Sequence, residues 1–139
     1  MTAKEYLMQA FRAKKKIASL REDIQRLENA ATDCSANLSG MPHNPSPTQS
    51  RMADIVCKMV DRKAELEKAL LDLEAIVVEI SYKICLIDNN DYRNILHMRY
   101  IDGFEWVDIS DKLSYSLSWT YRLHTQAIAE FKKINKDNS

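Results

Sequence analysis

Near its C-terminus the chain carries aromatic, hydroxyl and basic side chains at the spacing of one helix face. Arg122 can donate hydrogen bonds to a guanine edge or to a phosphate, and hydroxyl groups can bond to bases or phosphates. Two lysines further along the same segment could pair with phosphates. The candidate DNA-contact residues are Leu117, Ser118, Trp119, Tyr121, Arg122, Thr125, Lys132 and Lys133.

Three short helices are expected to position this face, over residues 91–101, 105–113 and 117–134. Gly103 suits the left-handed backbone position that follows a helix end. Ser116 can cap the third helix, because its hydroxyl can accept a backbone N–H of the first turn. Three helices joined by such short breaks are typical of a helix-turn-helix module, whose last helix enters the major groove of DNA.

The apolar residues of the module define its expected core. They are Trp106, Ile109 and Leu113 on the second helix, and Thr120, Leu123, Ala127 and Ile128 on the third. The small side chain of Ser110 would let the two helices cross closely. For Trp119 and Tyr121 two placements stay open, because each ring could contact DNA or pack against the long helices that precede the module.

At these residues the chain resembles region 4 of the sigma-70 family, a helix-turn-helix that binds the promoter −35 element. The resemblance runs from Ile95 to Ile134 and rests on Arg99-Tyr100-Ile101-Asp102-Gly103, Ile109, Leu113, Tyr115-Ser116 and Ala127-Ile128-Ala129. With its helical N-terminal part, the chain also resembles phage-encoded late transcriptional regulators of the RinA/ArpU type. The resemblance implies DNA binding and transcription control with host RNA polymerase, in the cytoplasm of a bacterial host and at its nucleoid.

Three departures from the sigma pattern limit what the resemblance implies. Sigma region 4 usually has Arg-Glu-Arg early in the recognition helix, where this chain has Leu117-Ser118-Trp119. Arg122 stands where a glutamine is usual, and Ser114 stands where the turn usually has glycine. The resemblance therefore does not imply that this chain recognises the −35 element. Because sigma regions 2 and 3 have no counterpart here, promoter melting is not implied either.

Residues 1–87 are predicted to form a long antiparallel helical hairpin of coiled-coil type. Its helices are expected over residues 4–31 and 50–87, joined by a proline-rich loop at 32–49, and residues 88–139 would form the second domain. Apolar residues recur at steps of 3 and 4 along both helices, which is the pattern of a packed seam. The alternative is a parallel homodimer through the second long helix. Either way the fold class is all-α.

Composition narrows the function classes further. The 139 residues have a formal net charge of zero, and no window of 18 apolar residues exists, so a membrane span is not expected. The N-terminus has no apolar run typical of a signal peptide. Cys34, Cys57 and Cys85 are scattered and form no CxxC pair. We therefore expect a reducing cytoplasm and neither a metal site nor a cofactor.

An enzyme is not expected, because the sequence has no glycine-rich phosphate loop, no HExxH and no nucleophile elbow. Residues 112–139 carry a net charge of +3, whereas residues 88–111 carry −4. This small basic footprint predicts weak, salt-dependent DNA binding by a monomer. Two alternatives remain: an adaptor that binds RNA polymerase or another regulator without DNA contact, and the DNA-recognition subunit of a phage packaging machine.

Overall fold

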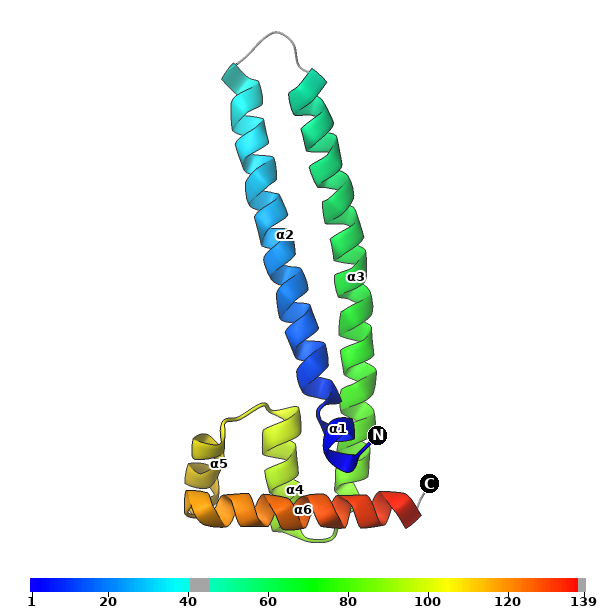
Figure 1. Ribbon diagram of the computed structural model, residues 1–139, viewed down its shortest axis with the longest axis vertical. Coiled ribbons are helices and arrows are strands. Elements are labelled where there is room, and N and C mark those ends of the chain that lie inside the picture. The colour runs from blue at the N-terminus through cyan, green and yellow to red at the C-terminus, as the bar shows by residue number, and fades with distance from the viewer. Residues whose placement is uncertain (41–45, 138–139) are drawn as a thin grey trace. The chain divides into compact units, whose positions relative to one another are not determined.

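The computed structural model describes residues 1–40 and 46–137, and over these residues it is helical without strands. This confirms the all-α fold class. None of the helices in the described ranges is long and apolar enough to cross a membrane. The elements, shown in Figure 1, are α1 (Ala3–Leu7), α2 (Gln9–Gly40), α3 (Ser46–Cys85), α4 (Asn90–Leu96), the π-helical turn η1 (His97–Ile101), α5 (Trp106–Leu113) and α6 (Leu117–Asp137).

The prediction of a loop at residues 32–49 is mostly wrong, because α2 continues to Gly40 and α3 already begins at Ser46. Cys34 is only 2% exposed, so it extends the apolar stripe of α2 past the predicted helix end. Pro47 stands in the first turn of α3, where a missing N–H costs no helical hydrogen bond. The rest of the predicted loop, residues 41–45, lies outside the described residues.

The first expected helix is also interrupted. α1 ends at Leu7, and α2 begins at Gln9 after a turn at Met8. Thr2 forms a capping box at the start of α1: its hydroxyl accepts the N–H of Glu5 at 3.2 Å, and the Glu5 carboxylate accepts the N–H of Thr2 at 3.2 Å. α1 is therefore a separately capped helix.

By packing, the chain divides into two compact units, and the boundary does not fall at residue 87. One unit combines Met1–Ala13 with Leu73–Ser139, and the other is Lys14–Asp72. The reason is that the last turns of α3 belong to the core of the first unit, where Ile80, Ile84 and Ile87 are at most 2% exposed. The end of the long helix is therefore a structural part of the C-terminal module.

The unit of residues 14–72 is a pair of antiparallel helices lying side by side (Figure 1). Its buried side chains are those of Ile17, Leu20, Ile24, Cys34, Ile55 and Ala69. They recur at the helical spacing that the sequence predicts for the seam. Each helix also carries exposed ion pairs between its own side chains, such as Arg62 with Glu65 at 2.9 Å. Pairs of this kind add little stability.

The other unit has a continuous apolar core to which every one of its helices contributes. The fully or nearly buried members are Leu7, Ala10, Ile80, Ile84, Ile87, Ile95, Leu96, Tyr100, Ile109, Leu123, Ala127 and Phe131. α6 crosses α4 and packs against α1, α4 and α5 (Figure 1). Burial of its inner face leaves the opposite face of α6 open to solvent.

Candidate nucleic-acid interface

The turn between α5 and α6 sets the direction of the candidate recognition helix. Ser114 adopts a left-handed conformation, with φ 60° and ψ 37°, at the position where the sigma pattern usually has glycine. Its N–H bonds to the carbonyl of Asp111 at 3.2 Å, and the next N–H, that of Tyr115, bonds to Ser110 at 3.0 Å. These two bonds satisfy the carbonyls at the end of α5 and turn the chain sharply.

The start of α6 is capped by Ser116, as the sequence predicts. Its hydroxyl accepts the N–H of Trp119 at 3.1 Å, and its carbonyl accepts the Thr120 hydroxyl at 2.9 Å. Ser110 is 6% exposed and donates its hydroxyl to the Val107 carbonyl at 2.7 Å. The small, internally bonded side chain therefore sits in the core of the module as expected.

A second corner joins η1 to α5 and depends on Arg99. Gly103 has a positive φ of 75°, which confirms the left-handed position expected for it. The Arg99 guanidinium donates to the carbonyl of Phe104 at 3.0 Å and lies 4.7 Å from the Trp106 ring and 5.2 Å from the Phe11 ring. Trp106, which the sequence places in the core, is half-buried and packs against the core, and its ring also contacts the Arg99 cation.

Tyr100 and His124 connect the first and last helices of the module through a hydrogen bond. The Tyr100 hydroxyl and His124 Nε2 are 2.7 Å apart, and the Tyr100 side chain is 2% exposed. Burial raises the pKa of Tyr100 to about 12. Burial, followed by the positive charges of Lys4 and Arg99, lowers the pKa of His124 to about 4. His124 is therefore neutral at pH 7 and shares a hydrogen bond with the protonated Tyr100 hydroxyl.

Two tyrosines add further links to α4. The Tyr115 hydroxyl donates to the Asp91 carboxylate at 3.0 Å, which raises the pKa of Tyr115 because the anionic form would be repelled. The Tyr92 hydroxyl donates to Gln126 Oε1 at 3.3 Å. Together with Tyr100–His124, these bonds hold α6 at two points and the turn before it at a third. These links were not predicted from the sequence, because their partners are 24 to 34 residues apart.

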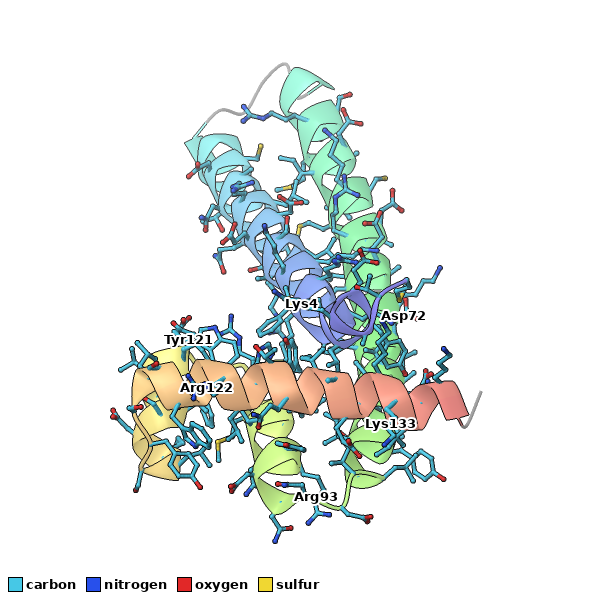
Figure 2. All side chains as sticks on the ribbon, turned by 60° about the horizontal axis from the view of Figure 1, so that its bottom comes forward. Lys4, Asp72, Arg93, Tyr121, Arg122 and Lys133 are labelled. Carbon is cyan, nitrogen blue, oxygen red and sulfur yellow. The ribbon has the colours of Figure 1, made fainter. Side chains whose placement is uncertain are left out.

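The structure places all eight candidate contact residues on exposed positions of α6. Leu117, Trp119 and Tyr121 are 40%, 39% and 46% exposed, and the other candidates are exposed as well. Thr120, Leu123 and Ala127 are buried and Ile128 is half-buried, so the expected inner face is correct. Figure 2 shows Tyr121 and Arg122 near the α5 end of α6, and Lys133 toward the other end.

The aromatic candidates are held by neighbours within the module. The Tyr121 ring meets Trp106 edge to face at 5.4 Å, and the Trp119 ring meets Tyr115 at 6.4 Å. Arg122 lies 5.9 Å from the Trp119 ring. Both rings are thus half covered and half exposed. Being two residues apart on α6, they flank the exposed stripe of Arg122 on its two sides, where each ring can contact a thymine methyl or a deoxyribose.

Charge is divided between the last two helices. α6 carries Arg122, Lys132 and Lys133 on exposed positions, and Ser118 and Thr125 lie on the same helical stripe. α5 and its start carry exposed acidic groups at Glu105, Asp108 and Asp111. Although α5 also carries the exposed Lys112, the outer face of α6 is therefore the more positive of the two. Among the described residues, no three His, Cys, Asp or Glu side chains gather as a metal site would require.

Comparison with family models matches residues 46–132, which is more than half of the chain, to one family. That family is described as Protein of unknown function (DUF1492). No curated protein and no solved structure matches the chain. The matched segment contains all of α3, α4, η1 and α5 and most of α6, including seven of the eight candidates named above, from Leu117 to Lys132.

Proposed function

The chain belongs to this family of unknown function, and from the geometry of its C-terminal module we propose that it is a sequence-specific DNA-binding transcription regulator. In this proposal it binds double-stranded DNA, uses no cofactor and catalyses no reaction. Its sigma-like resemblance suggests a phage or prophage regulator that acts with host RNA polymerase. It would work in the cytoplasm of a bacterial host, at the nucleoid.

One observation carries the proposal: the outer face of α6 is exposed along its first two turns and carries donors suited to bases and phosphates. This face directly follows a tight left-handed turn at Ser114, and α6 is braced by α4 and α5. In helix-turn-helix proteins the equivalent helix inserts its N-terminal part into the major groove. We assign base contacts to Ser118 and Arg122, and flanking apolar contacts to Trp119 and Tyr121.

Lys132 and Lys133 are assigned to phosphates, because they are exposed near the other end of α6. The distance along the helix from Arg122 to Lys133 is about 17 Å, which suits contacts on both sides of a groove. With these two cations on phosphates, the logarithm of the association constant should fall linearly with the logarithm of the salt concentration, with a slope of about −2. One chain alone would thus bind weakly.

The proposal is tested by fluorescence anisotropy with labelled duplex DNA at several salt concentrations. We expect Arg122→Ala, which removes an assigned base contact, to weaken binding about tenfold. Lys132→Ala, which removes an assigned phosphate contact, should reduce the salt slope by about one. Arg21→Ala is the matched control, because Arg21 is exposed on α2, outside the module. Equal affinities and slopes for Arg122→Ala and the unsubstituted protein would refute the assigned face.

A second candidate function is a protein–protein adaptor that binds RNA polymerase or another regulator without DNA contact. It is favoured by the exposed apolar side chains around the α5–α6 turn, which are Val107, Tyr115, Leu117, Trp119 and Tyr121. Aromatic side chains of this kind are enriched at the centres of protein interfaces. The acidic outer face of α5 beside them would suit a basic partner surface.

Retention on a DNA resin at low salt separates the two functions. The DNA-binding proposal predicts that the protein is retained, and that Lys132→Ala combined with Lys133→Ala shifts elution to lower salt. The adaptor proposal predicts flow-through on DNA, together with retention on immobilised RNA polymerase. In that case Trp119→Ala should abolish retention on polymerase, whereas the lysine substitutions should leave it unchanged.

A further inference from the structure

A pocket of about 440 Å³ opens where α1, the last turns of α3 and the end of α6 meet (Figure 1). We call it the lysine pocket, because Lys83 from α3 and Lys132 and Lys136 from α6 line it together with Ala3 and Tyr6 from α1. All residues that line it belong to the same compact unit. Small-molecule sites usually have volumes of about 300 to 1,000 Å³, so the pocket has the size of a ligand site.

The charge around the lysine pocket is positive. Lys132 and Lys136 are exposed and one helical turn apart on α6, with Cβ atoms about 5 to 6 Å from each other, a spacing at which like charges repel. The third cation, Lys83, is paired with the Glu79 carboxylate at 3.3 Å. None of the described residues that line the pocket is acidic. Three positive charges therefore stand against one negative charge, and an anion between the lysines would be stabilised.

The aromatic part of the lining is held in a fixed position. The rings of Tyr6 and Phe131 stack with their centroids 6.0 Å apart and their planes at 29°. Lys83 Nζ lies 4.3 Å from the centroid of the Tyr6 ring. The side-chain amide of Asn135 donates to the Phe131 carbonyl at 2.8 Å. The pocket thus combines apolar walls of fixed shape with a few charged groups, which is the usual composition of a small-molecule site.

The Tyr6 hydroxyl is a second sign that a partner is missing from the lysine pocket. Its oxygen is buried, and within the described part of the chain it has no hydrogen-bond partner. It is protonated at pH 7, because burial raises the pKa of Tyr6, although Lys83 nearby opposes the rise. Buried polar groups rarely stay without a partner. An acceptor oxygen brought by a ligand would give this hydroxyl one.

We propose that the lysine pocket binds a small phosphate monoester that carries an apolar body. The phosphate group of a monoester has a charge of about −1.5 to −2 at pH 7 and three strong acceptor oxygens. These values match the two positive charges in excess and the three ammonium groups, of Lys83, Lys132 and Lys136. The apolar body would lie against Tyr6 and Phe131. A carboxylate, with a single charge, would leave half of the excess charge uncompensated.

DNA is another source of phosphate groups, and Lys132 is assigned above to a DNA phosphate. Each phosphate of the DNA backbone carries one negative charge, so it would neutralise only half of the excess charge of the pocket. The doubly charged monoester is therefore the better match. Binding of the small ligand is measured without DNA, so its result does not depend on the DNA-binding proposal.

Nuclear magnetic resonance titration of the isotope-labelled full chain with phenyl phosphate tests the ligand class. At about 0.15 M ionic strength we expect a dissociation constant of about 1 mM, with the largest shifts at Tyr6, Lys132 and Lys136. Inorganic phosphate has no apolar body and benzoate has a single charge, so each should bind at least about fivefold more weakly. Equal affinity for inorganic phosphate or benzoate would overturn the ligand class, and shifts confined to other parts of the chain would overturn the site.

Substitution of the lysines tests the assigned contacts. We expect Lys132→Gln combined with Lys136→Gln to weaken binding of phenyl phosphate at least about tenfold. The matched control is Lys133→Gln, because Lys133 is exposed on the same helix but does not line the pocket. It should change the affinity for phenyl phosphate by less than about twofold, because salt screens more distant charges. All three lysines are exposed, so the helical circular dichroism should persist. Unchanged affinity in the double variant, or an equal loss with Lys133→Gln, would refute the proposal.

Discussion

The unit of residues 14–72 and the C-terminal module are both all-helical, but they are stabilised in different ways. The first has one row of buried side chains between two helices and exposed ion pairs along them. The second has a continuous core, capped helix ends, and side-chain hydrogen bonds between α4 or η1 and the helices that follow. The two-helix unit is held by apolar packing along one seam, whereas side-chain hydrogen bonds also hold α6 in the module. This difference fits a module that presents one face accurately.

Truncation of a core side chain in the module should cause the largest loss of unfolding free energy. Leu96→Ala removes a fully buried side chain from the centre of the core and should cost about 3 to 4 kcal/mol of unfolding free energy. Leu20→Ala at the two-helix seam, where the side chain is 6% exposed, should cost less, because the pair can close around the gap. Chemical denaturation of both variants measures the difference. A larger loss for Leu20→Ala would contradict the comparison.

Acid should destabilise the module next most strongly, through His124. Its pKa is about 4 in the folded protein and 6.5 as its ordinary value, so the unfolded chain binds the proton more tightly. The stability is fully present above pH 6.5 and is lost as the pH falls toward 4. Because solvent screens this half-buried ring in part, the total loss should be about 2 to 3 kcal/mol.

Urea denaturation between pH 7 and pH 4 measures this loss. His124→Gln provides the control, because glutamine can accept the bond from Tyr100 but does not titrate. We expect its stability to change much less between pH 6.5 and pH 4. A variant with the same pH dependence as the unsubstituted protein would show that other groups cause the acid sensitivity.

A substitution in the turn before α6 should change the unfolding free energy by a smaller amount, and in the stabilising direction. A left-handed conformation has a steric cost for serine but not for glycine. Ser114→Gly removes this cost and should raise the unfolding free energy by about 1 kcal/mol. Thermal unfolding measures it, and Ser118→Gly is the control, since glycine within a helix should lower stability instead. A destabilised Ser114→Gly protein would contradict the strain assigned to this turn.

The smallest effect is expected for the exposed ion pairs of the two-helix unit. Arg26 pairs with Asp23 at 3.0 Å and Glu22 at 3.8 Å, and its side chain is 73% exposed. Arg26→Gln should change the unfolding free energy by less than about 0.5 kcal/mol. Denaturation at low and high salt checks this, and a loss above about 1 kcal/mol would mean that charge, not apolar packing, stabilises this unit.

Local features of the fold could be predicted from the sequence, because the interactions that create them lie within a few residues. The Ser116 cap, the left-handed Gly103 and the buried face of α6 belong to this group. The end of α2 was misplaced, because the polar run after Ala31 suggested a loop while burial of Cys34 continues the helix. The composition of a segment does not show whether packing against another helix buries it and so extends the helix.

The links that orient the candidate interface could not be predicted in the same way. Tyr100 and His124 are 24 residues apart, so no local pattern in the sequence points to their hydrogen bond. Arg99 was part of the sigma-like pattern, yet its place between two aromatic rings depends on Phe11 from a distant part of the chain. Helical periodicity separates the exposed face of α6 from its buried face, so exposure of Ser118, Arg122 and Thr125 follows from the sequence. Their contact with DNA stays a prediction.

The most direct test of the central claim, that the outer face of α6 reads DNA, is selection of bound duplexes from a fully random pool by the full chain. We predict that one sequence is enriched, and that Arg122→Ala loses or alters the preference at one or two positions while Arg21→Ala retains it. A pool with no enriched sequence, or the same enriched sequence with Arg122→Ala, Ser118→Ala and the unsubstituted protein, would contradict it.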